Sequence, residues 1–228
     1  MAQRTAAAEP SDTAQAGGGA PTARAAISLR GLRRDYGDRP ALAGVDVEVS
    51  AGSTLAVLGP NGSGKTTLLR VLAGLLRPSG GSAVVLGCSL PGEAWRLRGR
   101  VGMLAHRPLL YRDLSARENL RLAARLHGLG DAGREDRIGG LLRAVGMERR
   151  ADDVVSELSA GMAQRVAACG AVLHEPELLL LDEPDSHLDA EARELVGALI
   201  GPVPGRTRVL VSHDRERAIA SSDRVLEL

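Results

Sequence analysis

The feature that most constrains this chain is a glycine-rich octapeptide between a strand pattern and a helix pattern. Residues 59–66 read Gly-Pro-Asn-Gly-Ser-Gly-Lys-Thr, which matches G-x-x-x-x-G-K-[ST]. The apolar run 54–58 before it predicts a strand, and a helix is expected to begin after Gly64. In such a unit the glycines let backbone N–H groups wrap an anion, and the helix N-terminus adds a favourable dipole. The sequence therefore predicts a phosphate-binding loop on an α/β fold.

The residues of this phosphate loop have distinct expected roles in binding a nucleotide. Lys65 is expected to reach the β- and γ-phosphates, and Thr66 to ligate Mg²⁺. Lys65 is also the only lysine among the 29 Lys and Arg residues of the chain. A compact ammonium group fits between phosphate oxygens where a wide, planar guanidinium group is not equivalent, so replacing Lys65 should abolish nucleotide hydrolysis most directly. The expected nucleotide-binding residues here are Gly59, Pro60, Asn61, Gly62, Ser63, Gly64, Lys65, Thr66 and Thr67.

A second motif, Asp182-Glu183-Pro184, follows the apolar run 178–181. Such a run is typical of a parallel strand covered on both faces. At its end Asp182 is expected to face the metal, usually through water, and Glu183 to lie beside the γ-phosphate. A carboxylate there can orient or deprotonate the attacking water, which makes Glu183 the candidate general base. The alternative for Glu183 is an acidic residue that only starts a helix before Pro184.

Composition excludes several other classes of protein. No apolar run among the 228 residues approaches the roughly 20 that a membrane-spanning helix needs. Cys88 and Cys169 lie far apart without metal-ligand spacing, which disfavours a disulfide framework or zinc site and is compatible with a reducing cytosol. The net charge of +1 argues against a dedicated nucleic-acid binder, so no nucleic-acid partner is expected.

The sequence divides into a tail and one large domain. Residues 1–25 are rich in Ala, Gly, Thr and Ser and are expected to form a disordered tail. Polar residues at 9–12 interrupt it, so it is not expected to act as a signal peptide. Residues 91–156 read mostly as helices, and they hold 13 Arg against seven acidic residues over 91–150. The other expected elements are strands at 27–32, 45–49, 101–104, 178–181 and 208–211 and helices at 115–127, which opens with a capping box, and 190–200.

Residues 158–165, Leu-Ser-Ala-Gly-Met-Ala-Gln-Arg, carry a resemblance to a known family. They resemble the signature, typically Leu-Ser-Gly-Gly-Gln, of ATP-binding subunits of ABC transporters, with Ala160 and Met162 as departures. The order of motifs also resembles that family, with 186–189 as its D-loop and 212–214 around its switch histidine. The resemblance covers 26–228 and implies a P-loop NTPase (RecA-like) core, an inserted helical subdomain at about 91–156, and an N-terminal antiparallel β region.

The resemblance also implies that the chain works as a homodimer or heterodimer with ATP and Mg²⁺ as cofactors. Ser159 and Gly161 would bind the phosphate of an ATP held by the opposite subunit, because a Ser hydroxyl and amides at a helix N-terminus bind anions. Asp189 would reach across the dimer, although it would also serve as a solvated helix N-cap. His213 would contact the γ-phosphate and hold Glu183 and the water; the alternative is a core histidine that ends a strand.

Two residues of this chain need separate weighing against the family pattern. Tyr36 stands where the family places an aromatic ring that stacks on adenine, with plain packing as the alternative. His106 stands where most members carry the Gln of the Q-loop. Imidazole is a poor Mg²⁺ ligand, which puts metal contact by His106 in doubt. We hypothesise that His106 keeps the link to a membrane partner without ligating metal; the alternative is a surface histidine.

The resemblance implies a peripheral protein on the cytoplasmic face of the cell membrane that powers export through integral membrane subunits. The run His106-Arg107-Pro108 and the Leu-Ser-Ala-Gly form of the signature resemble the heme exporter type associated with cytochrome c maturation, the CcmA-like subunits. The alternatives are another small ABC exporter for a drug, lipid or ion, and a soluble ABC-type ATPase. A kinase or GTPase with the same loop would have no use for the signature. The Arg-rich segment 91–150 would face the membrane partner, or else carry solvated helix faces.

Overall fold

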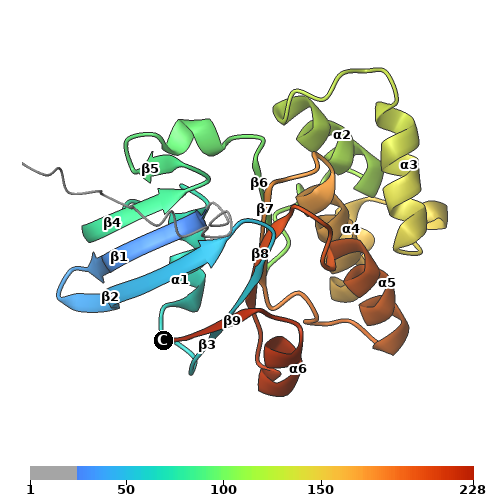
Figure 1. Ribbon diagram of the computed structural model, residues 1–228. Helices are drawn as coiled ribbons and strands as arrows, with labels where there is room; N and C mark the ends of the chain where they lie inside the picture. The colour runs from blue at the N-terminus through green and yellow to red at the C-terminus, as the bar shows by residue number, and fades with distance from the viewer. Residues whose placement is uncertain (1–24) are drawn as a thin grey trace, which may run out of the picture.

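The computed structural model describes residues 25–228, in which two β-sheets and six α-helices form the fold. One sheet is parallel and lies at the centre, and the other is antiparallel and lies at one side (Figure 1). The expected tail at 1–25 lies outside the described residues except for Ala25, which starts the first strand. Within the described range no helix has the length and apolar character needed to span a bilayer.

The parallel sheet has five strands in the order β6-β7-β8-β3-β9. Its neighbours pair in parallel register, for example Leu181 of β7 with Leu210 of β8. Since β3 lies between β8 and β9, strands far apart in the sequence are adjacent in the sheet. The strands are β3 (Thr54–Leu58), β6 (Val101–Leu104), β7 (Leu178–Asp182), β8 (Thr207–Val211) and β9 (Arg224–Glu227).

Strand β7 explains why this sheet forms at the centre. All five of its residues are buried, and successive side chains point to opposite faces of the sheet. Leu179 and Leu181 pack into the core on the helical side, whereas Leu178 and Leu180 pack into the core on the side of the antiparallel sheet. The continuous leucine run is therefore two alternating apolar faces, as expected for a strand covered on both sides.

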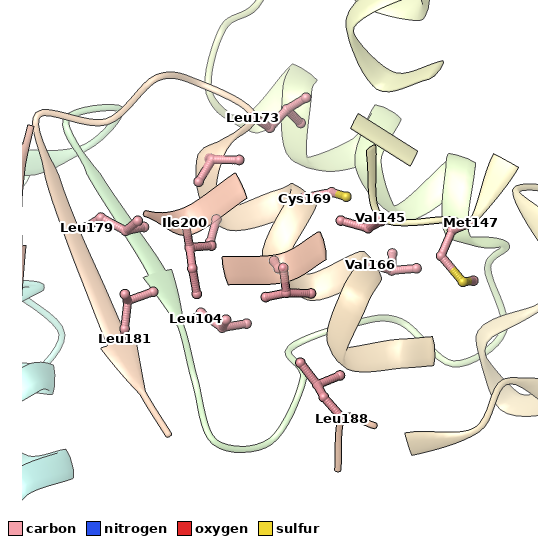
Figure 2. Close-up of a cluster of buried hydrophobic side chains, with 14 of the residues drawn as sticks. Leu104, Val145, Met147, Val166, Cys169, Leu173, Leu179, Leu181, Leu188 and Ile200 are labelled. Atoms are coloured by element: carbon pink, nitrogen blue, oxygen red, sulfur yellow. The ribbon is translucent and has the colours of Figure 1, made fainter. Parts of the chain in front are cut away.

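Five helices lie on the helical side of the sheet (Figure 1). Figure 2 shows Leu179 and Leu181 of the sheet packed with Val166 and Cys169 of α4 and Ile200 of α5. Burial raises the pKa of the Cys169 thiol to about 12, so it stays neutral in this core. The helices are α2 (Ala116–Leu126), α3 (Arg134–Ala144), α4 (Ala160–Val172), α5 (Ala190–Ile200) and α6 (Arg215–Ala220), with 3-10 turns at Glu148–Arg150 and Val155–Glu157.

The other side of the sheet is covered by α1 (Lys65–Leu72) and by the antiparallel sheet. Leu68, Leu69 and Leu72 of α1 are fully buried between the two sheets. The antiparallel strand order is β2-β1-β4-β5. Together these layers confirm the expected P-loop core with an N-terminal antiparallel β region. The strands are β1 (Ala25–Tyr36), β2 (Arg39–Ser50), β4 (Gly80–Val85) and β5 (Cys88–Leu90), followed by a 3-10 turn at Ala94–Leu97.

The segment at 91–156, expected as an inserted helical subdomain, contributes to two parts of the fold. Its strand β6 pairs with β7 in the parallel sheet, and its helices begin only at Ala116. The capping box predicted for the first helix is present. Ser115 Oγ accepts from the Glu118 N–H at 3.2 Å, and the Glu118 carboxylate accepts from the Ser115 N–H at 2.8 Å. The residues that form only helices and turns therefore follow β6.

We expect truncation of Leu181 to destabilise the protein by about 2–5 kcal/mol, because Leu181→Ala removes a fully buried side chain and leaves a cavity. The matched control is Leu126→Ala, whose side chain is 75% exposed and should change the free energy of unfolding by about 0.5 kcal/mol or less. Denaturant unfolding of both variants measures the difference. Equal effects at the two positions would contradict the assignment of Leu181 to the core.

Candidate functional site

The candidate site lies where four parallel strands end at one edge of the sheet. The phosphate loop follows β3, His106 follows β6, Asp182 and Glu183 end β7, and His213 follows β8. Ligand sites of parallel α/β sheets lie outside the carboxyl ends of the strands, and this edge is such a place. It holds a cleft of about 640 Å³ lined by Asn61, Thr66, Arg70, Met103, Ala105, His106, Arg107, Leu109, Asp182, Glu183 and His213.

The phosphate loop is shaped by glycine at positions that no other residue fits. Gly64 caps the N-terminus of α1 with φ of +101°, and a Cβ atom there would lie 2.1 Å from the Ala41 carbonyl oxygen of β2. Gly59 has φ of +148°, and a Cβ atom would meet Leu228 O at 2.6 Å. The loop therefore approaches its neighbours too closely for side chains at these two positions.

Lys65 is the buried cation of this loop. Its side chain is 7% exposed, and its Nζ donates to the carbonyl oxygens of Gly59 and Pro60, both at 2.9 Å. The Ser63 hydroxyl is buried in the same loop without a protein partner. A buried ammonium and a buried, unpaired hydroxyl beside a helix N-terminus suit a phosphate group, so the residues present fit the nucleotide expected from the sequence.

Thr66 and Asp182 form the pair expected to hold Mg²⁺. Thr66 Oγ1 donates to Asp182 Oδ2 at 2.8 Å, and Asp182 is only 2% exposed. Within 25–228 no group of three or more His, Cys, Asp and Glu residues is arranged to hold a metal by itself. Mg²⁺ usually binds one or two protein oxygen ligands and completes its shell with water and substrate phosphates, so this hydroxyl and carboxylate fit that ion.

The Glu183 carboxylate lies between two imidazole rings. His213 Nε2 is 2.5 Å from Glu183 Oε1, and His106 Nδ1 is 3.1 Å from Glu183 Oε2. The Glu183 side chain is only 17% exposed. Its backbone has a left-handed φ of +53°, and its N–H donates to Val211 O of β8 at 3.0 Å. A non-glycine residue in that region is uncommon, which marks Glu183 as a position fixed by its surroundings.

Tyr36 lies at the end of β1, outside the cleft. Its ring is half exposed, and the Arg34 guanidinium carbon lies 4.8 Å from the ring centroid. Tyr36 pairs with Arg39, two residues along β2 from Ala41, whose carbonyl oxygen abuts Gly64. An exposed ring face close to the phosphate loop is available for stacking, and it already contacts a cation on one side.

The signature segment and the D-loop contact each other rather than the cleft. Ser159 caps α4 by accepting from the Met162 N–H at 3.2 Å, and Asp189 caps α5 by accepting from the Ala192 N–H at 2.8 Å. A Cβ atom on Gly161 would lie 2.6 Å from His187 O of the D-loop, so the two segments are in close contact. Ser159 and Asp189 are exposed, and neither they nor Gly161 line the cleft.

Two features of the cleft were not predicted from the sequence. One is Arg70, which lines the cleft four residues after Thr66 on α1. That spacing places two side chains on one helix face, so the signal was present in the sequence. The other is the contact of His106 with Glu183, which depends on the adjacency of β6 and β7 and has no local signal.

The fold and the motifs define the class of the protein. The family model described as ABC transporter matches residues 42–186, which run from β2 to the start of the D-loop. The chain therefore belongs to the ABC transporter family, among its ATP-binding subunits. Its phosphate loop, signature segment and Asp182-Glu183 pair all lie inside the matched region.

Curated relatives of known name support this placement. The chain is 39% identical over 200 residues to the Nod factor export ATP-binding protein I of Cupriavidus pinatubonensis, with 87% of this chain and 62% of that protein covered. It is 39% identical over 204 residues to the daunorubicin resistance ATP-binding protein DrrA3 of Streptomyces coeruleorubidus, with 88% and 64% covered. The chain thus spans a little over 60% of the length of these relatives.

Solved structures agree with the fold. The dimeric bacterial ABC transporter cassette MJ0796 superposes with a TM-score of 0.81 at 27% identity, covering 89% of this chain and 94% of that one. A structure described as the ATP-binding subunit of an ABC transporter gives a TM-score of 0.80 at 30% identity, covering 89% and 85%. The described residues therefore have the fold of an ABC ATPase cassette.

We expect Gly64→Ala to destabilise the protein by about 2 kcal/mol or more and to abolish nucleotide binding. The added Cβ would clash with the Ala41 carbonyl group in a backbone conformation that disfavours alanine. The control is Gly197→Ala in α5, where an added Cβ atom would meet nothing within 4 Å. This substitution should stabilise the helix by about 0.5–1 kcal/mol. Denaturant unfolding and binding of a fluorescent ATP analogue measure both effects. Normal nucleotide binding by Gly64→Ala would contradict the close packing of the loop.

Proposed function

We propose that this chain is the ATP-binding and ATP-hydrolysing subunit of an ABC exporter. The observation that carries the proposal is the Glu183 carboxylate, held by His106 and His213 next to the Thr66–Asp182 pair. A carboxylate fixed beside a magnesium and phosphate site can accept the proton of the attacking water, so Glu183 is the general base.

The other residues of the cleft have supporting roles in this proposal. Backbone N–H groups of the phosphate loop and the ammonium of Lys65 bind the β- and γ-phosphates. Thr66 and Asp182 hold Mg²⁺, which when bound neutralises charge that develops on the phosphates. His213 orients Glu183 and contacts the γ-phosphate, and the exposed face of Tyr36 stacks on adenine.

A second copy or a related chain completes the site in this proposal. Ser159, Gly161 and Asp189 lie outside the cleft of their own chain, and Ser159 and Asp189 are exposed. The N-terminus of the 13-residue helix α4 and the Ser159 hydroxyl form an anion-binding surface that suits the phosphate of a partner's nucleotide. Two chains arranged head to tail would bury two ATP molecules between them.

We expect Glu183→Gln to keep ATP binding, to accumulate an ATP-bound dimer and to lose nearly all turnover, because an amide cannot accept the proton of the water. Phosphate release and light scattering with and without ATP measure the two effects. Glu191→Gln, at an exposed residue near the start of α5, is the matched control and should hydrolyse ATP as the unaltered chain does. Normal turnover in Glu183→Gln would remove Glu183 as the base.

An apolar groove of about 570 Å³ supports the proposal that the partners are integral membrane subunits. It lies between the core and helices α2 and α4 and is lined in part by Leu75, Trp95, Leu109, Tyr111 and Leu126. These five side chains are all among the exposed large hydrophobic residues. Trp95 and Tyr111 are two of the three Trp and Tyr residues of the chain, which has no Phe. Gathering of exposed apolar side chains in one groove is typical of a protein interface.

Two of the side chains that line this groove, His127 and His174, are uncharged at neutral pH. His127 and His174 stack there with ring centroids 3.7 Å apart. Burial lowers the pKa of His174 to about 4, and burial also lowers the pKa of His127. Two neutral rings in the lining of an apolar groove suit an apolar segment of a membrane protein. Through such a contact the chain would lie on the cytoplasmic face of the membrane.

Two substrate classes follow from different observations. The matched relatives are named for export of Nod factor and for daunorubicin resistance, which favours a small exporter of an amphipathic drug or lipid-like molecule. The run His106-Arg107-Pro108 favours the second candidate, heme export in cytochrome c maturation. Identification of the membrane subunits that co-purify with the chain distinguishes the two.

We expect Trp95→Asp and Tyr111→Asp to keep ATP binding but to abolish recovery of the chain with membrane subunits, because each places a charge in the apolar groove. The control is Val203→Asp, which is exposed and lies outside the groove. Detergent extraction of native membranes followed by affinity purification measures the recovery. Recovery of soluble partners only, unchanged by the groove variants, would favour the soluble ABC-type ATPase instead.

A further inference from the structure

His106 contacts the one carboxylate oxygen of Glu183 that His213 does not contact. His106 Nδ1 lies 3.1 Å from Oε2, and His213 Nε2 lies 2.5 Å from Oε1. The two histidines come from different strands, since His106 follows β6 and His213 follows β8, on either side of β7. Glu183 therefore has one imidazole on each oxygen, from both neighbours of its own strand.

The chemistry of the contact fixes the state of the His106 ring. A carboxylate is an acceptor, so the nitrogen that faces it must carry a proton and donate. At 3.1 Å from Oε2, Nδ1 of His106 is within hydrogen-bonding distance of Glu183, and a protonated Nδ1 has no lone pair for a metal ion. The ring of His187 is the other aromatic neighbour, at a centroid distance of 6.3 Å, and it is tilted rather than stacked. His106 is therefore oriented chiefly by Glu183.

The backbone of Glu183 is already fixed, whereas its carboxylate needs support. The Glu183 N–H donates to Val211 O, and the Glu183 carbonyl accepts from the Ser186 N–H at 3.1 Å. The terminal torsion of a glutamate side chain has only a broad, roughly two-fold preference, so one hydrogen bond leaves the carboxylate free to turn. A second hydrogen bond on the other oxygen stops that rotation.

We propose that His106 is a positioning residue for the general base, which it holds through an Nδ1–H···Oε2 hydrogen bond that complements the contact from His213. This inference rests on the proposed ATP hydrolysis and assigns a role to the residue that stands in place of the usual Gln. This second contact would improve the orientation of the base, because a carboxylate held at both oxygens presents the same lone pair to each attacking water.

The test compares three substitutions of His106 in the full chain. His106→Ala removes the donor, and because a hydrogen bond to a charged group contributes about 1.5–3 kcal/mol, kcat should fall about 10- to 100-fold. The KM for ATP should stay within about twofold, since the phosphate loop is unchanged. His106→Asn places an amide N–H where Nδ1 stands and should restore most of kcat. His106→Gln places its amide farther out and should restore less, and Arg112→Ala, on an exposed residue of the same loop, should leave kcat unchanged.

A double-mutant cycle separates action through Glu183 from an independent role. In the Glu183→Gln background, His106→Ala should change the residual rate by less than about twofold, because the two residues act on one step. The Mg²⁺ concentration at half-maximal rate should be the same for the unaltered chain and His106→Ala. A large shift in that concentration, or better rescue by Gln than by Asn, would overturn the proposal in favour of a metal contact.

A readout without turnover tests the contact itself. In histidine-labelled full chain, nitrogen NMR should show an Nδ1–H proton on His106 that is protected from exchange and becomes exposed to exchange in Glu183→Ala. Unprotected Nδ1 in the unaltered chain, or kcat within twofold in His106→Ala, would overturn the proposal. A chain that hydrolyses no ATP, with or without its membrane subunits, would refute the proposed function, and the NMR signal would then decide the contact alone.

Discussion

The burial of the parallel sheet on both faces is the constraint on which the rest of the structure depends. Strand β7 supplies Leu179 and Leu181 to the core on the helical side and Leu178 and Leu180 to the other core. Because this alternation fixes the register of β7 against β6 and β8, it also fixes where each strand ends. Asp182 and Glu183 stand at that end, so the packing of leucines sets the position of both carboxylates.

Local patterns predicted the elements whose signals lie within one segment. The strand at 54–58 and the helix at 190–200 have the predicted bounds, and the capping box at Ser115 and Glu118 is present. The strands β4, β5 and β9 and the helix α6 had not been assigned, because they are short or depend on neighbours for their burial, and α3 was covered only by the general helical prediction for 91–156. For β4, pairing with β1 supplies the stability that its glycine-containing sequence does not indicate, and the three-residue strand β5 is stabilised by its pairing with β4.

The candidate site shows the same division. The phosphate loop and the Asp182-Glu183 pair were predicted because each is a contiguous motif whose chemistry requires those residues. Of the two imidazoles around Glu183, only that of His213 was predicted to contact it. The contact of His106 joins residues 77 positions apart in sequence and arises from the order of the strands. The residues Met103, Ala105 and Leu109 around His106 line both the cleft and the apolar groove. One short segment thus separates Glu183 from the surface proposed for the membrane partner.

The contact between Gly64 and Ala41 links the phosphate loop to the hairpin that carries Tyr36. It joins the start of α1 to β2, and β2 continues as a hairpin through Arg39 to Tyr36. The few residues of β2 between Tyr36 and the phosphate loop therefore set the distance between the two. Because a strand advances about 3.3 Å per residue, inserting one residue between Arg39 and Ala41 would increase the distance from Tyr36 to the phosphate loop by about the same amount. The antiparallel sheet therefore covers the core and also fixes how far Tyr36 lies from the phosphate loop.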